Sequence, residues 1–257
     1  GDMARDAGLG ESGEDIDRLV EAGDPTVLTV LDAYAREVAV GVANLLYDFA
    51  AEMGAGILSA RYSRFVIDLN RPEDDAALYQ TATTGLFPDI FFDGVSIFRP
   101  GSSRSDAMRE TAKAQIWRPY HGKLAAELEA IKSRFGHATL LDAHSIRGLV
   151  PRLFDGPLPD FNIGTNSGAS CATALSDRLA AICDQPGYRH VVNGRFKGGH
   201  ITRQYGQPSK NVHAVQLELA QRTYMNEDPP FDYRPTVADK VRPILRNFVQ
   251  AMIDWKP

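Results

Sequence analysis

A short apolar run that ends in a cluster of polar side chains constrains the fold of this chain more than any other segment. Residues 138–141 favour a buried strand, and Asp142, His144, Ser145 and Arg147 follow it directly. Ligands in open α/β sheets bind at the carboxyl ends of the strands. The Asp-x-His pair can therefore supply a metal ligand with a carboxylate beside it, or it can cap the strand by bonding to backbone groups.

A second strand region, predicted to open at residues 56–60, continues over residues 64–72 and ends in the same way. Side chains alternate between its two faces and a proline stops it, so Asn70 and Arg71 lie at its end. The planar guanidinium group of arginine can hold a carboxylate through two hydrogen bonds. We expect Asn70 and Arg71 to bind a substrate carboxylate. For Asp68 we expect a structural ion pair with a nearby arginine.

A glycine-rich segment, residues 193–206, is a third candidate for the site. It combines four glycines with a histidine, a tyrosine and three cations, namely Arg195, Lys197 and Arg203. Glycine lets the backbone approach a ligand closely. An exposed basic hairpin is the alternative, and the local density of functional groups favours a ligand-binding segment.

A third predicted strand, residues 212–219, carries one carboxylate among mostly apolar residues. Alternation places Glu218 on the same face as Gln216 and Ala214. A carboxylate in such a place either pairs with an arginine or performs acid/base chemistry. Together with the other segments, the pattern favours a general base.

Charge and length limit the classes of function. The chain has 257 residues, a formal net charge of −5 and no run long enough to span a membrane. This balance argues against broad nucleic-acid binding, whereas clustered arginines still permit a small anionic substrate. We expect no nucleic-acid partner and no membrane partner.

The two cysteines, Cys171 and Cys183, cannot form a disulfide framework. A reducing cytoplasm is therefore the expected compartment. Cys171 follows a loop of small residues that could bind an anion, and a role as nucleophile is conceivable. A small buried thiol is the commoner case.

Helical periodicity predicts helices over residues 25–53, 105–135, 175–182 and 237–255, the second kinked or split at its proline. The acidic segment 1–24 is expected to be loosely ordered. No repeat and no linker divides the chain, so residues 1–257 are predicted to form a single domain.

Four segments in this order resemble the N-formylglutamate amidohydrolase (deformylase) family. They are residues 61–72, 142–147, 193–203 and 213–219, and the resemblance extends from about Leu46 to Tyr233. It implies an α/β fold of the zinc-carboxypeptidase or phosphorylase/hydrolase type, with a mixed central sheet flanked by helices. It also implies zinc-dependent hydrolysis of N-formyl-L-glutamate to formate and L-glutamate, a step of histidine degradation.

The resemblance assigns roles residue by residue. His144 would be a zinc ligand, and Glu218 would be the general base that takes a proton from water. The cations of the site would bind the carboxylates of a small dianionic substrate or stabilise the developing oxyanion. The substrate-binding residues predicted in this way are Arg64, Asn70, Arg71, Arg195, Lys197 and Arg203.

The first fifty residues depart from the family pattern. An early Pro-His-x-Gly motif and a Thr-Asp segment, which supply metal ligands in the family, are missing, and no histidine precedes His121. The metal could be held differently, with help from His200, Asp32 or Glu37. Alternatively, the protein could bind acyl-amino acids or dicarboxylates without hydrolysing them.

Overall fold

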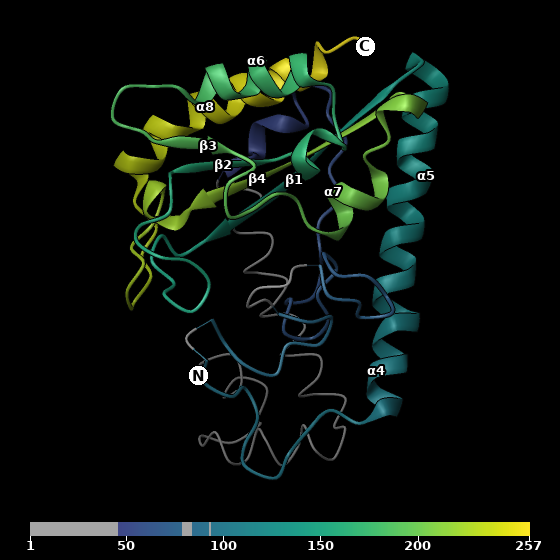
Figure 1. Cartoon of the computed structure of the whole chain (residues 1–257), viewed down its shortest axis with the longest axis vertical. Coiled ribbons are helices and arrows are strands. Elements are labelled where there is room, and N and C mark those ends of the chain that lie inside the picture. Colours follow the sequence, from purple (N-terminus) through teal and green to yellow (C-terminus); the bar gives the residue numbers. More distant parts are fainter. Residues whose placement is uncertain (1–45, 79–83, 93) are drawn as a thin grey trace.

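The computed structural model describes residues 46–78, 84–92 and 94–257 (Figure 1). The helices are α4 (Asp106–Ala112), α5 (Arg118–Phe135), α6 (Thr173–Cys183), α7 (His200–Tyr205) and α8 (Pro235–Ile253), and a π-helical segment (Lys113–Trp117) joins α4 to α5. The strands are β1 (Ala138–Ile146), β2 (Phe161–Gly164), β3 (His190–Val192) and β4 (Val212–Ala220). Short 3-10 turns occur at Asp48–Ala50, Asn166–Gly168, Pro208–Lys210 and Gln221–Thr223.

The strands form one mixed sheet in the order β1-β4-β2-β3. The central strand β4 runs parallel to β1 and antiparallel to β2, whereas β3 runs parallel to β2. In the β1–β4 register, His144 lies opposite Glu218. The mixed central sheet flanked by helices, which the family resemblance implies, is confirmed.

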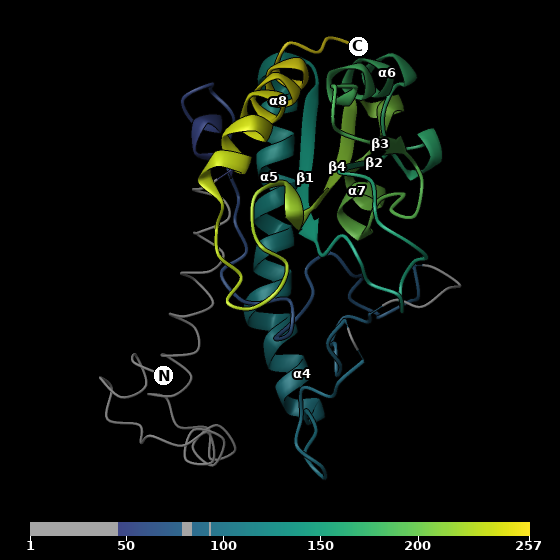
Figure 2. The same cartoon turned by 90° about the vertical axis from the view of Figure 1, so that its left-hand side faces the viewer.

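Helices cover both faces of the sheet (Figures 1 and 2). On one face, α6 and α8 enclose the main core, whose largest fully buried side chains include Phe161, Leu217 and Phe248. On the other face, Leu124 and Leu128 of α5 pack with residues of α7 and the start of β1. The alternation predicted for β4 therefore places its large apolar residues in the main core and leaves Gln216 and Glu218 for the α7 face.

Five predicted elements agree with the structure, with shifted boundaries. Two of them are the helices predicted over 175–182 and 237–255, which are α6 and α8. The strand predicted at 138–141 extends to Ile146, so Asp142 and His144 belong to β1 and do not follow its end. The helix predicted over 105–135 is interrupted by the π-helical segment just before Pro119, and Gly136 ends it with a φ of 79°. A strand over 212–219 is confirmed as β4.

The predicted strands at 56–60 and 64–72 are wrong, because neither range contains strand structure. In the second range, hydrogen bonds to Asp68 explain why no strand forms. Its Oδ1 accepts from the Asn70 N–H at 3.0 Å, and its carbonyl accepts from the Arg71 N–H at 3.0 Å. Aspartate satisfies nearby backbone groups in this way and replaces a ladder with a turn.

The predicted helix over 25–53 falls largely outside the described residues, as does the predicted segment 1–24. At its described end the chain forms only the 3-10 turn Asp48–Ala50, whose Phe49 is buried in the main core. No helix in the described part of the chain is long and apolar enough to cross a membrane.

A buried histidine joins α5 to α7. Nε2 of His121 donates to the carbonyl of Leu69 at 3.0 Å, and Nδ1 lies 2.9 Å from the hydroxyl of Tyr205. The ring of Trp117 lies 3.9 Å away, centroid to centroid. Burial lowers the pKa of His121 to about 4, so this side chain is neutral in the folded protein at pH 7.

This pKa shift predicts a loss of stability in mild acid. The pKa of His121 is lower in the folded chain than in the unfolded chain, so its contribution is complete above about pH 6.5 and is lost as the pH falls towards 4. We expect the free energy of unfolding to fall by on the order of 2 kcal/mol over this range through His121. Urea unfolding at several pH values should show that the free energy of unfolding falls less with decreasing pH for His121→Phe than for the wild type. The same pH dependence in both proteins would contradict the assignment.

Candidate active site

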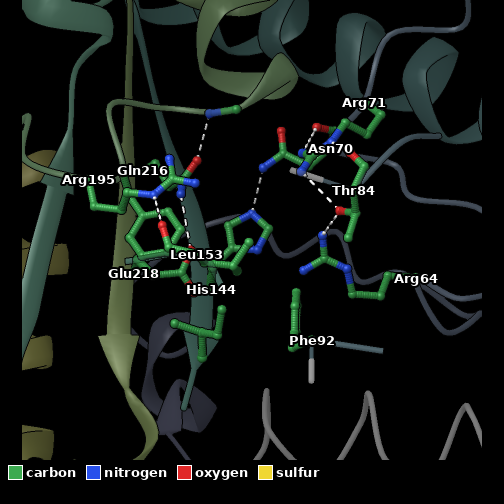
Figure 3. Close-up of a pocket in the computed structure, with 13 residues that line it drawn as sticks. Arg64, Asn70, Arg71, Thr84, Phe92, His144, Leu153, Arg195, Gln216 and Glu218 are labelled. Carbon is green, nitrogen blue, oxygen red and sulfur yellow. Dashed lines mark hydrogen bonds between the residues drawn. The ribbon is translucent and has the colours of Figure 1, made fainter. Parts of the chain in front are cut away.

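A pocket on the α7 face of the sheet gathers side chains from four separate parts of the chain (Figure 3). It is lined by Arg64, Asn70, Arg71, Thr84, Phe92, His144, Ile146, Leu153, Arg195, Phe196, Gly199, Gln216 and Glu218. Three arginines, one histidine and one glutamate thus share a site beside the β1–β4 pair. An anion with a hydrolysable bond is the kind of ligand that such a set suits.

His144 lines the pocket, and the buried Asp142 lies beside it on β1. Two residues apart on β1, they project from the same face of the strand, and Nε2 of His144 lies 2.7 Å from Oδ1 of Asp142. Burial by itself lowers the pKa of His144. The carboxylate of Asp142 and, to a lesser extent, that of Glu218 outweigh this effect and raise the pKa to about 9.

Asn70 connects this pair to α7. Its Nδ2 donates to Oδ2 of Asp142 at 3.0 Å and lies 2.9 Å from Nε2 of His144, while its Oδ1 accepts from the Ile201 N–H at 2.9 Å. A Cβ at Gly199 would come within 2.4 Å of the Asn70 amide, so only glycine fits there. In this arrangement the amide orients His144 and the start of α7. Direct binding of substrate by Asn70 stays a prediction.

Glu218 is held by its neighbour on the same face of β4. Nε2 of Gln216 donates to Oε2 of Glu218 at 3.2 Å, and Oε1 of Gln216 accepts from the Gly199 N–H at 2.7 Å. Burial raises the pKa of Glu218, although His144 and Arg64 oppose the shift. A raised pKa makes a carboxylate a better general base near neutral pH.

Two arginines occupy one side of the pocket and a third lies on the other (Figure 3). Arg64 forms the predicted ion pair with Asp68, at 2.5 Å, and Nη1 of Arg71 lies 3.8 Å from the same carboxylate oxygen. Nε of Arg195 donates to the Leu153 carbonyl at 2.6 Å. His144 lies between the two sides in the view of Figure 3.

The structure brings together six of the eight predicted site residues: Arg64, Asn70, Arg71, Arg195, His144 and Glu218. The other two, Lys197 and Arg203, do not line the pocket. Lys197 is exposed, and Nε of Arg203 donates to the Gly198 carbonyl at 2.9 Å. The glycine-rich segment is no hairpin, because it turns into α7 at His200.

Sequence reasoning missed two buried polar residues of the pocket, Gln216 and Thr84. Gln216 carried a usable signal, since it alternates with Glu218 on one face of a strand. Thr84 carried none, because no local pattern connects it with the arginines that precede it.

The donor atoms of the described residues do not by themselves fit a catalytic zinc site, which normally has three protein ligands. Among the described residues no group of three His, Cys, Asp or Glu side chains could hold a metal ion. All six histidines of the sequence fall within the described residues, and His144 alone of them lines the pocket. His200, suggested above as a substitute ligand, lies against Trp117 with ring centroids 5.9 Å apart. Asp32 and Glu37 lie outside the described residues.

Neither cysteine contributes to the pocket. Cys171 and Cys183 are buried in the main core, and burial raises the pKa of their thiols to about 11 and about 12. A thiol that stays protonated at neutral pH is a poor nucleophile. The structure therefore favours the interpretation of Cys171 as a packing residue.

The double role of Gln216 predicts a specific loss of stability. Replacing it with leucine leaves the Gly199 N–H and the Glu218 carboxylate without a buried partner, which should lower the free energy of unfolding by about 1–3 kcal/mol. Chemical denaturation measures the change. As a control, Gln250→Leu removes a surface hydrogen bond to Asp254 and should have a smaller effect. Equal effects of the two substitutions would contradict a structural role for Gln216.

Comparisons with known proteins agree with the four-segment resemblance. The sequence model of a family described as N-formylglutamate amidohydrolase matches residues 14–225. The N-formylglutamate deformylase of Pseudomonas aeruginosa is 58% identical over 211 residues, which cover 82% of this chain and 79% of that protein. The enzyme of the same name from Pseudomonas putida is 56% identical over the same shares.

Two solved structures share the fold of this chain. The crystal structure of N-formylglutamate amidohydrolase from Ralstonia eutropha JMP134 superimposes with a TM-score of 0.63 at 25% identity, and the match covers 82% of this chain and 79% of that one. A gene product of Agrobacterium tumefaciens, 16% identical, shares the fold with a TM-score of 0.56 over 84% of this chain and 76% of that one. With a family match over most of its length, this chain belongs to the N-formylglutamate amidohydrolase family.

Proposed function

We propose that this protein hydrolyses the amide bond of N-formyl-L-glutamate and releases formate and L-glutamate. The two Pseudomonas relatives carry the name of this activity, and each shares more than half of the aligned residues. They give no support to the alternative of a non-catalytic binding homologue. The observation in the structure that carries the proposal is the pocket, which places a buried glutamate among three arginines.

The charges of the pocket suit a substrate with two carboxylates. Arg64 and Arg71 lie on one side of His144 and Arg195 lies on the other, so each end of a short dianion meets a guanidinium group (Figure 3). Charge-assisted hydrogen bonds of this kind are about twice as strong as neutral ones. The formamide group, which branches from the α-carbon that joins the two carboxylate-bearing arms, would then lie near His144 and Glu218.

Glu218 is the proposed general base. It takes a proton from the water whose oxygen attacks the formyl carbon, and it returns the proton to the amide nitrogen as the carbon–nitrogen bond breaks. Its raised pKa and its hydrogen bond from Gln216 support the role, because the first strengthens the base and the second fixes its direction.

We further propose a cytoplasmic location. The two cysteines are free and buried, as is usual in a reducing compartment. A small dianion remains the proposed partner of the pocket.

Zinc dependence, which the family resemblance implies, stays a prediction. In the described part of the pocket, His144 supplies the imidazole that a metal could bind. A site with one imidazole should hold zinc weakly. We expect dialysis against a chelator to remove the metal from purified protein. Near-stoichiometric zinc after dialysis would instead mean that residues outside the described part complete the site.

Formate release from N-formyl-L-glutamate tests the function. We expect turnover by the wild-type protein, and we expect Glu218→Gln to lower kcat by about a hundredfold or more with little change in KM, because the substitution removes the base and keeps the shape. Glu129→Gln, on the exposed face of α5, is the matched control and should behave like the wild type. Normal turnover by Glu218→Gln would overturn the assignment of the base.

A further inference from the structure

Thr84 lies between the two arginines on one side of the pocket (Figure 3). Its hydroxyl accepts from Nη2 of Arg64 at 3.3 Å and from Nη2 of Arg71 at 3.2 Å. Its carbonyl accepts from Nε of Arg71 at 2.6 Å. Thr84 is 6% exposed, so water does not readily replace these bonds.

Asp68 holds the same two arginines from another direction. Its carboxylate lies 2.5 Å from Nη2 of Arg64 and 3.8 Å from Nη1 of Arg71. One negative charge against two positive charges leaves this side of the pocket with a net charge of about +1. Asp68 and Thr84 therefore fix the two guanidinium groups and do not neutralise them.

We propose that Thr84 is a positioning residue that sets Arg64 and Arg71 as a single receptor for one carboxylate of the substrate. The inference rests on the proposed function and deepens it, because it divides substrate recognition between two groups of arginines, one for each carboxylate. Thr84 serves the half formed by Arg64 and Arg71, and Arg195 serves the other half across His144.

The hydroxyl oxygen is the atom on which this role depends. Two lone pairs allow it to accept from both arginines at once, which couples their positions. Valine has the same shape without the oxygen, so Thr84→Val removes the coupling and leaves the carbonyl bond to Arg71 in place. Serine retains the oxygen.

Competition by two singly charged analogues tests the proposal. N-formyl-L-glutamine has only the α-carboxylate, and 4-formamidobutanoate has only the distal one. We expect Thr84→Val to raise the KM for N-formyl-L-glutamate about tenfold, because the charge-assisted hydrogen bonds from the two arginines to the substrate carboxylate are weakened. The kcat should stay within about twofold of the wild-type value. The inhibition constant should rise for one analogue and stay unchanged for the other, which also identifies the carboxylate that Thr84 serves.

Two further variants complete the test. Thr84→Ser should restore a KM close to that of the wild type. Thr111→Val, which removes a hydroxyl bonded to the Ala107 carbonyl on α4, should change nothing. A general structural effect of Thr84→Val would raise the inhibition constants of both analogues equally. Either this result or an unchanged KM would overturn the proposal.

Failure of the proposed function is distinguishable from failure of this inference. A wild-type protein that releases no formate refutes the function. The role of Thr84 is then decided by calorimetry with glutarate, which carries two carboxylates and no formyl group. Weaker binding of glutarate by Thr84→Val than by the wild type supports the role, and equal binding or no binding to either protein overturns it.

Discussion

The parallel pairing of β1 with β4 is the interaction on which the site depends. Its register places His144 opposite Glu218 and Asp142 opposite Gln216. Because side chains alternate along a strand, a slip of β4 by one residue would turn Gln216 and Glu218 towards the main core and away from His144 and Asp142. The large apolar residues of β4, Leu217 among them, oppose such a slip because they are fully buried on the other face. The hydrophobic core thus sets the geometry of the polar pocket.

Hydrogen bonds then attach the irregular part of the chain to this strand pair. Asn70, which comes from a segment without regular structure, bonds to Asp142 on β1 and to the backbone of α7. Gln216 joins β4 to the residue before α7. Without these two side-chain amides, buried polar groups between the sheet and the loop would have no hydrogen-bond partner. The segment that carries Arg64 and Arg71 is positioned by polar contacts in place of a strand ladder.

Buried charge is the second constraint on the site. Asp68, Asp142 and Glu218 are all buried, and each carboxylate loses hydration on folding. Arg64 and His144 provide opposite charges, and hydrogen bonds from Asn70 and Gln216 satisfy further oxygens. Removing one partner of such a set leaves an uncompensated charge, which costs far more than the pair contributes. The charged groups of the pocket are therefore held in place before any substrate binds.

The sequence predicted those parts that depend on local periodicity. The strand at β4, the end of α5 at Gly136 and the common face of Gln216 and Glu218 follow from spacing and from glycine. Arg64, Asn70 and Arg71 line the pocket although the strand predicted to carry them does not exist, and a turn at Asp68 places Asn70 against Asp142 of β1. Lys197 and Thr84 show the limit of such reasoning. Whether a loop side chain points into a pocket or into solvent depends on tertiary contacts that no period in the sequence encodes.

A crystal structure of the protein with L-glutamate bound would test the central claim most directly. The account predicts that the ligand occupies the pocket beside His144, with one carboxylate against Arg64 and Arg71 and the other against Arg195. Both carboxylates on the same side of His144, or a ligand bound elsewhere, would contradict it.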